Sequence, residues 1–144
     1  METAQMGKVV VPMKLENLFD IADRDRGRLA ADQVRNVEVT EALVDTGAYG
    51  MLLPTRIITQ LGLTPVRTRM TRTLGGRVTQ MSYSAVRFTI MDRDGICDVG
   101  EIPDEFPPII GQIPLEMLDL VVDPIGQRVT GNPEHGGAWI MEML

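Results

Sequence analysis

The sequence predicts an all-β fold with one or two short helices. Glycine and proline occur 14 and 9 times and are scattered along the chain, which favours short strands joined by turns over a helical bundle. Several segments also alternate between apolar and polar residues, the pattern of a strand with one buried face. The 144 residues suit one domain, because a chain of this length buries roughly 70% of its unfolded surface. We therefore expect residues 1–144 to form one domain, with 130–144 as a C-terminal tail.

The alternating segments give the expected strands. Segment 37–44 is the clearest, since it first alternates and is then continuously apolar up to Asp45, as in a strand that enters the core. Strands are predicted at residues 9–15, 37–44, 66–70, 86–90, 96–102 and 109–110, with a hairpin at 121–129. Turns or loops are predicted at residues 23–27, 92–95, 103–108 and 132–137.

Two short helices interrupt these strands. Pro54 suits the first position of a helix, apolar residues between 57 and 61 follow at helical spacing, and Gly62 is a typical stop. Segment 114–118 is the second short helix.

The composition argues against several classes of function. A net charge of −6 disfavours general binding to nucleic acid or to anionic membranes. One cysteine and one histidine exclude an intrachain disulfide and a Cys/His zinc site, and we expect no metal and no other cofactor. No apolar run approaches the roughly 20 residues of a membrane helix, and the valine run near the N-terminus is too short for a signal peptide. We expect a cytoplasmic protein.

The tripeptide Asp45-Thr46-Gly47 is the strongest candidate for a functional site. It follows a buried strand, so the carboxylate should have a fixed direction at the edge of the core, as general acid–base chemistry needs. Gly47 has no Cβ and allows another backbone or a ligand to approach closely. An isolated Asp-Thr-Gly is more often a plain turn in which the aspartate caps backbone N–H groups, so the surrounding sequence has to decide.

The surrounding residues resemble the retropepsins, the single-domain retroviral-type aspartic proteases, and in particular their bacterial members. Segment 42–48 (Ala-Leu-Val-Asp-Thr-Gly-Ala) is similar to the active-site strand and turn, and segment 52–63 to the part that follows it. Segment 74–77 (Leu-Gly-Gly-Arg) falls where the family has the tip of its flap. Segment 109–111 (Ile-Ile-Gly) resembles the second signature, two apolar residues and a glycine before a short helix. The resemblance covers residues 37–129.

This resemblance implies a closed, barrel-like fold and an aspartic endopeptidase. Such enzymes use two carboxylates that share one proton, whereas this chain has a single Asp-Thr-Gly. The second catalytic carboxylate would therefore be Asp45 of another copy, in a C₂ homodimer with the active site on its axis.

The family also implies roles for the residues around Asp45. Thr46 would hydrogen-bond across the two-fold axis, and Gly111 would pack against the active-site loop. A flap at residues 71–82 would close over a peptide or protein substrate. The residues expected to contact that substrate are Gly47, Ala48, Leu74, Gly75 and Gly76.

The chain departs from the retroviral pattern at two positions. An aspartate two residues after Gly47 commonly pairs with an arginine after the second signature, but these positions hold Tyr49 and Gln112. The strands that join the retroviral dimer are represented only by the candidates 9–11 and 138–140. For both, a sheet edge within one subunit is an equal alternative.

The remaining features have plainer interpretations. His135 is interpreted as a solvated loop residue and Cys97 as a small core or edge residue. The arginines between 67 and 77 are interpreted as the exposed face of strands beside the flap, with attraction of an acidic substrate or single-stranded nucleic acid as the alternative. A second functional hypothesis stays open. It is a retropepsin-like domain that binds a protein segment or only dimerises, without useful turnover, because a fold does not fix a function.

Overall fold

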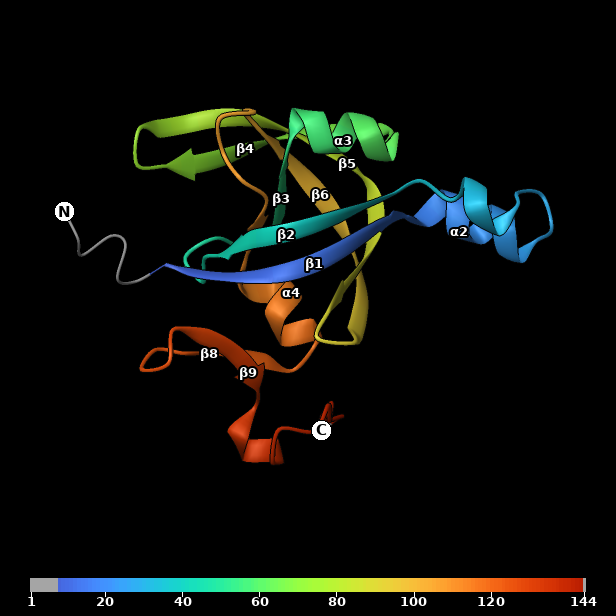
Figure 1. The fold of residues 1–144 in the computed structure, drawn as a ribbon. Coiled ribbons are helices and arrows are strands. Elements are labelled where there is room, and N and C mark those ends of the chain that lie inside the picture. The colour runs from blue at the N-terminus through green and yellow to red at the C-terminus, as the bar shows by residue number, and fades with distance from the viewer. Residues whose placement is uncertain (1–7, 144) are drawn as a thin grey trace.

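Six strands close into a barrel, and the pairing of the first strand with the fifth completes the ring (Figure 1). The computed structural model describes residues 8–143. Around the barrel the strands follow the order β1 (Val9–Asn17), β2 (Asn36–Val44), β7 (Ile109–Ile110), β3 (Met51–Pro54), β6 (Arg93–Ile102) and β5 (Gly76–Ile90). The predicted all-β, barrel-like fold is confirmed.

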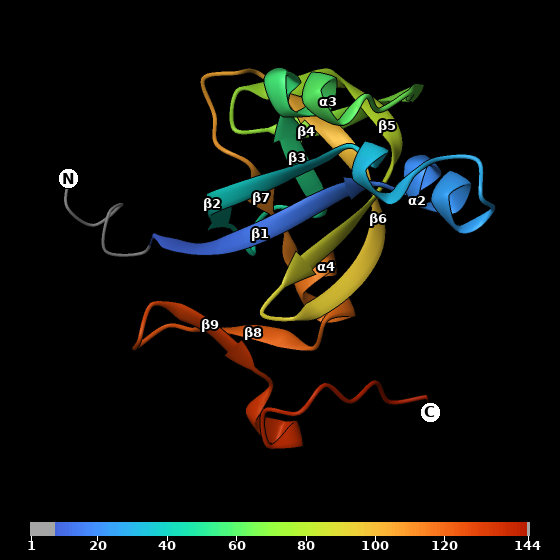
Figure 2. The ribbon, with the colours of Figure 1, turned by 45° about the vertical axis from the view of Figure 1, so that its right-hand side comes forward.

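Two hairpins extend this barrel. β4 (Pro65–Thr73) pairs with the first half of β5 and projects beyond the ring. β8 (Leu120–Asp123) and β9 (Arg128–Gly131) form a separate two-stranded sheet, which lies beneath the barrel in both ribbon views (Figures 1 and 2). This second hairpin lies where the sequence predicted it.

The core follows from the alternation of the strands. In the second half of β5 every other residue is buried, and Val86, Phe88 and Ile90 point inward. β2 alternates between exposed and half-buried residues along its first half and becomes buried at Ala42 and Val44, as predicted for a strand that enters the core. The strand interiors are thus held by burial of apolar side chains on one face.

Residues 8–143 contain three α-helices, one more than the sequence predicted: α2 (Leu18–Asp25), α3 (Thr55–Leu61) and α4 (Gln112–Met117). The charged segment 23–27, predicted as a turn, is instead the end of α2 followed by a turn at Arg26. The buried Asn17 caps this helix by accepting a hydrogen bond from the backbone N–H of Asp20 (3.2 Å), and Ile21 anchors it. The charged residues 23–25 belong to the less buried side of a short amphipathic helix. Because they form a continuous charged run, the sequence pattern indicated a turn rather than a helix.

Other boundaries differ more widely. β5 begins at Gly76, ten residues before the predicted segment 86–90, β6 begins at Arg93 rather than at 96, and the short strand β3 was not predicted. Pro54 ends β3 and caps α3, which begins at Thr55 rather than at the proline, and Gly62 stops the helix in the left-handed conformation. The turn predicted at 92–95 is the two-residue turn Met91-Asp92, with positive φ at both positions. The described part of the chain also contains two short 3₁₀ helices, η1 (Ala31–Gln33) and η2 (Pro133–His135).

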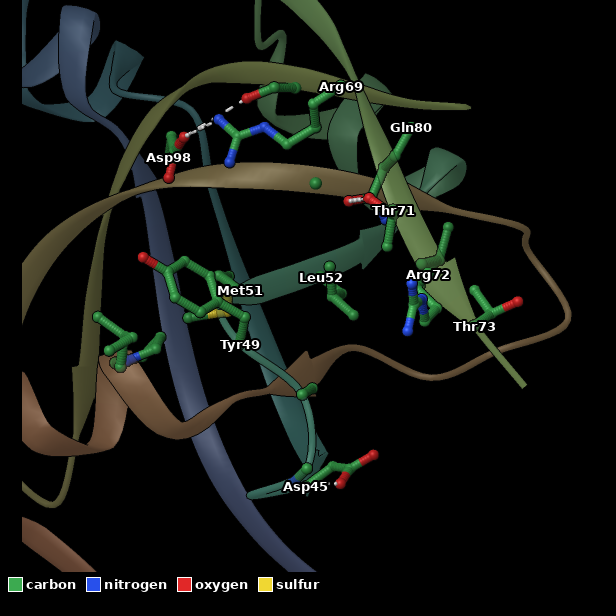
Figure 3. Close-up of a pocket in the computed structure, with 18 of the residues that line it drawn as sticks. Asp45, Tyr49, Met51, Leu52, Arg69, Thr71, Arg72, Thr73, Gln80 and Asp98 are labelled. Carbon is green, nitrogen blue, oxygen red and sulfur yellow. Dashed lines mark hydrogen bonds and ion pairs between the residues drawn. The ribbon is translucent and has the colours of Figure 1, made fainter. Parts of the chain in front are cut away.

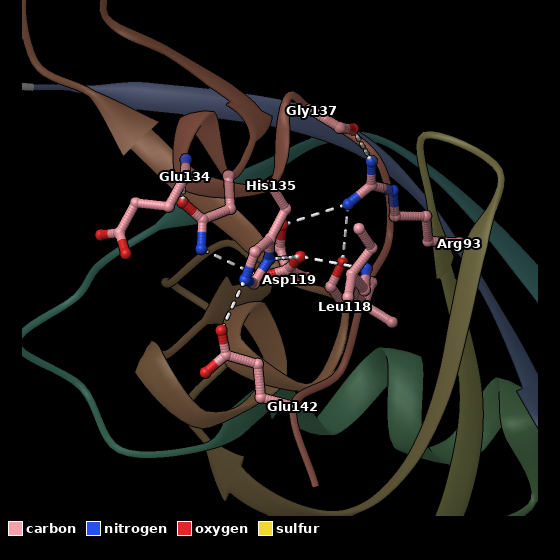
Figure 4. A network of polar contacts seen from close by, with 9 residues as sticks. Arg93, Leu118, Asp119, Glu134, His135, Gly137 and Glu142 are labelled. Atoms are coloured by element: carbon pink, nitrogen blue, oxygen red, sulfur yellow. Dashed lines mark hydrogen bonds and ion pairs between the residues drawn. The ribbon is translucent and has the colours of Figure 1, made fainter. Parts of the chain in front are cut away.

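His135 is not the solvated loop residue that the sequence predicted. Its side chain is only 16% exposed, and its Nδ1 lies 2.6 Å from Oδ2 of the buried Asp119 (Figure 4). Its Nε2 lies 3.2 Å from a carboxylate oxygen of Glu142. Asp119 also accepts hydrogen bonds from the Asn132 side chain (3.1 Å) and from the backbone N–H of Ile140 (3.2 Å). This cluster fastens the C-terminal segment to the β8–β9 sheet, and we call it the Asp119 clasp.

The two candidate dimer strands have different surroundings. Residues 9–11 belong to β1 and pair with β2 inside the same chain, with Val9 opposite Val44. Residues 138–140 form no strand, and Trp139 and Ile140 are about half exposed. A role of either segment between subunits stays a prediction. Among residues 8–143, no helix combines the length and apolar character needed to cross a membrane.

Candidate active site

Asp45 lies at the edge of the barrel because β2 ends there beside β7. The two strands run parallel, with Val44 opposite Ile110, and the backbone N–H of Asp45 donates to the carbonyl of Ile110 (3.0 Å). The chain then turns sharply, and the N–H of Gly47 donates to Oδ1 of Asp45 (2.9 Å). The carboxylate is therefore oriented by its own turn while the residue stays exposed.

The loop after Asp45 is fixed by the start of α4. The backbone N–H groups of Gly111, Gln112 and Ile113 donate to the carbonyls of residues 50, 48 and 49, at 2.9, 2.9 and 3.0 Å. A Cβ on Gly111 would lie only 2.5 Å from the carbonyl oxygen of Gly50 and 2.7 Å from that of Ala48. Since these are backbone atoms, only glycine allows this approach. Gly111 thus packs against the Asp45 loop as expected, while its part in catalysis stays a prediction.

The same contacts involve Tyr49 and Gln112, the two positions at which the sequence departs from the retroviral pattern. Gln112 supports the loop through its backbone N–H, and Tyr49 offers its backbone carbonyl. The Tyr49 side chain is 76% exposed and lies in the space above the loop (Figure 3). Backbone hydrogen bonds therefore order this loop locally, and the Tyr49 side chain lines the groove.

A groove of about 920 Å³ opens above Asp45 (Figure 3). The Asp45 loop forms its floor, and the β4–β5 hairpin forms the opposite wall. Of the residues expected to contact substrate, the structure brings Gly47, Ala48 and Leu74 to this groove. It also brings in residues that were not among the predicted substrate contacts, including Leu52, Gln80, Ser82, Asp98 and Ile113. The only sequence signal that could have indicated that Gln80, Ser82 and Asp98 lie on one face of the sheet is the alternation of side-chain direction along β5 and β6.

The β4–β5 hairpin has the form expected of a flap. Thr73 pairs with Gly76, so Leu74 and Gly75 make a two-residue turn, and Leu74 is fully exposed. Gly76 has φ of +115°, which a residue with a side chain rarely adopts. The Thr73 hydroxyl closes the turn by donating to the carbonyl of Gly76 (2.9 Å). The tip is thus held by local hydrogen bonds and stands away from the barrel.

A second cavity of about 430 Å³ lies against the same hairpin, between it and the loop before β7. Its lining is mostly apolar and includes Ile102, Phe106 and Ile109. Thr71, Thr73 and Gln80 border both cavities. Phe106 belongs to no recognisable sequence motif. Its position in this cavity is set by the course of the loop before β7, which the sequence does not indicate.

Two other kinds of chemistry, a cysteine nucleophile and a metal site, find no support in the structure of residues 8–143. Cys97 is partly buried in β6, where burial and the neighbouring charge of Asp98 raise the pKa of its thiol to about 12. A thiol with that pKa stays protonated and is a poor nucleophile. Within residues 8–143, no group of three or more histidine, cysteine or acidic residues is arranged to hold a metal ion.

Comparison with known proteins agrees with this geometry. A protein-family model described as aspartyl protease matches residues 32–128. This range includes the Asp45 loop, the β4–β5 hairpin and Gly111, and it covers about two thirds of the chain. A search of curated proteins finds no match.

Proposed function

The chain belongs to the retropepsin-like aspartyl protease family, and from this premise we propose that it is an aspartic endopeptidase that works as a C₂ homodimer. One observation carries the proposal. Asp45 has an oriented carboxylate that stays exposed on the floor of a peptide-sized groove. The only other aspartate that lines the groove, Asp98, is paired with Arg69 at 3.3 Å. A second free carboxylate in matching geometry is therefore supplied by Asp45 of a second copy.

In this mechanism the two Asp45 carboxylates share one proton, because like charges this close do not both ionise readily. The ionised carboxylate takes a proton from a water molecule as that water attacks the peptide carbonyl, and the protonated one polarises the carbonyl oxygen. The tetrahedral intermediate then collapses as the leaving amine receives a proton. The chemistry needs no metal, so a chelator should leave the activity unchanged.

The neighbouring residues support this chemistry. Thr46 is exposed beside Asp45 and would hydrogen-bond across the two-fold axis, while Gly111 keeps the loop at a fixed distance from α4. Gly47 and Ala48 would contact the peptide from below, and Leu74, Gly75 and Gly76 from the flap above. An extended substrate would bind between them largely through main-chain hydrogen bonds, as an added strand does. Closure of the flap would exclude water from the developing charge.

The test is cleavage of unfolded casein and of a peptide library across the range from about pH 3 to about pH 8, so that an acidic optimum is not missed. The protein should cleave, and Asp45→Asn should not. Asp32→Asn is the matched control, because Asp32 is exposed in η1 and its side chain makes no hydrogen bond within residues 8–143. Tight binding of peptides without cleavage would favour the second hypothesis, a binding or dimerisation domain.

A further inference from the structure

The β4–β5 hairpin concentrates positive charge on an acidic protein. Residues 65–82 contain four arginines and no acidic residue or lysine. The whole chain has a net charge of −6, so the hairpin carries +4 and all other residues together carry −10. The four side chains are exposed: Arg67, Arg69, Arg72 and Arg77. Such a separation of charge influences which ligands the protein attracts and does not determine its fold.

Arg72 is the one of these arginines that brings uncompensated charge to the groove. Arg69 also lines the groove, but Asp98 neutralises it at 3.3 Å. Among residues 8–143, no carboxylate lies within ion-pair distance of Arg72. Figure 3 shows its guanidinium extending from the hairpin toward the side of the groove on which Asp45 lies.

Arg77 strengthens the field at this point. It lies directly opposite Arg72 in the hairpin register. Like charges directly opposite each other on two antiparallel strands destabilise the pair. It too makes no ion pair within the described part of the chain. A carboxylate bound at this position would relieve the repulsion and could be held by a guanidinium through two hydrogen bonds.

The groove near Asp45 has a different character. Ala48, Leu52 and Ile113 line it there, and the shared negative charge of the catalytic pair would repel an acidic side chain. Resting on the proposed function, we propose that Arg72, with Arg77 beside it, makes the enzyme prefer peptides with apolar residues at the scissile bond and an acidic residue farther along the strand. Nucleic acid is the other polyanion that arginines bind, but residues 65–82 contain no aromatic side chain on which bases could stack.

The test compares peptides that are identical except for Glu or Gln at one position flanking an apolar scissile pair. The ratio of kcat/KM between the Glu and the Gln peptide should be about fivefold at the favoured position, as for one partly exposed ion pair. Arg72→Gln should bring this ratio close to one, and added salt should lower it in the wild-type protein. Arg28→Gln is the matched control, because Arg28 is exposed after α2 and is equally without an ion pair among residues 8–143. It should leave the ratio unchanged.

The outcomes separate this inference from the proposed function. Equal kcat/KM for Glu and Gln peptides at every position would overturn the preference while leaving the protease intact. So would a loss of preference of the same size in Arg28→Gln. If no peptide is cleaved, the proposed function fails, and fluorescence anisotropy of the same peptides then tests the preference by affinity alone. Stronger competition by a single-stranded oligonucleotide than by the Glu peptide would assign the arginines to nucleic acid instead.

Discussion

Two aspartates at the ends of short apolar segments have opposite surroundings. Asp119 is buried, and its carboxylate is held by His135, Asn132 and a backbone N–H. Asp45 is exposed, and its only side-chain hydrogen bond within residues 8–143 comes from Gly47. One carboxylate is fully satisfied within its own chain, whereas the other is oriented and left open.

The difference separates a carboxylate that holds structure from one that is available for chemistry. A buried carboxylate must have partners, because an unpaired buried charge is costly. An exposed carboxylate at a groove has no such need, and its exposure in one chain agrees with a site that a second copy completes. We therefore expect changes at Asp45 to affect activity and changes at Asp119 to affect stability.

The sharpest test of this contrast exchanges each aspartate for asparagine. Asp45→Asn should lower kcat/KM by at least about 10³-fold with an unchanged melting temperature, because it removes the general base but keeps the shape of the turn. Asp119→Asn should lower the melting temperature and keep the activity of the molecules that remain folded. Peptide cleavage and thermal unfolding of both variants check this. Full activity in Asp45→Asn would show that another residue is the base.

A second test concerns the open side of Asp45. If a second copy completes the site, activity per subunit should fall by more than about tenfold on dilution well below the dissociation constant of the dimer. The contacts of the Asp119 clasp lie within one chain, so the stability that they add to each subunit should not depend on protein concentration. Specific activity against concentration, with sedimentation in parallel, is the measurement. Constant specific activity in a demonstrated monomer would remove the shared-dyad mechanism.

A third test concerns the support behind the Asp45 loop. Gly111→Ala adds a Cβ within 2.7 Å of two backbone carbonyls, so the loop or α4 must move. Overpacking of this kind costs about 1–3 kcal/mol of unfolding free energy, and the shifted Asp45 should lose activity as well. Gly50→Ala is the control for the unfolding measurement, because a Cβ there meets nothing within 4 Å. Denaturant unfolding and peptide cleavage measure the two effects.

The sequence predicted the barrel better than it predicted the contacts between distant segments. Alternation in β2 and β5 is a local signal of one buried face, and it located these strands and the entry of β2 into the core. The helix α2 was missed because its cap, Asn17, is the last residue of a strand and its charges resemble a turn. At such a junction between a strand and a helix, the local sequence signals for a turn and for a helix compete. The helix forms with Ile21 buried against the rest of the protein.

The two aspartates left different signals in the sequence. A motif with a fixed order marked the Asp45 loop, the turn at Leu74-Gly75 and Gly111 as candidates, and their roles in catalysis stay predictions. Nothing local connected Asp119 with His135, which is 16 residues away, since the pairing depends on the β8–β9 hairpin folding back. Likewise, Tyr49 and Gln112 indicated that an ion pair is absent, but the backbone hydrogen bonds made by these two residues carry no side-chain signature in the sequence.

The smallest predicted effect is a pH dependence of stability that arises from the Asp119 clasp. Hydrogen bonds that the His135 ring donates to the carboxylate of Asp119, and then to that of Glu142, raise the pKa of His135 above its ordinary value of 6.5. The charged histidine therefore contributes stability that is fully present below pH 6.5 and is lost as the pH rises through the raised pKa. The hydrogen bond with His135 lowers the pKa of Asp119 below 3.8, so its contribution is lost only as the pH falls through that lowered value.

Both contributions are complete between pH 3.8 and 6.5, and the clasp should be strongest there. His135 is the only histidine of the chain, so the loss of stability between pH 6.5 and mild alkaline conditions can be assigned to it. His135→Gln should lower the melting temperature most inside this window and least above it. Glu142→Gln, which removes the second partner, should have a smaller effect of the same sign.

Thermal unfolding against pH at fixed protein concentration measures these effects. All variants carry Asp45→Asn as well, which prevents self-cleavage. A difference between His135→Gln and its parent that does not change with pH would show that the clasp acts by packing rather than by charge.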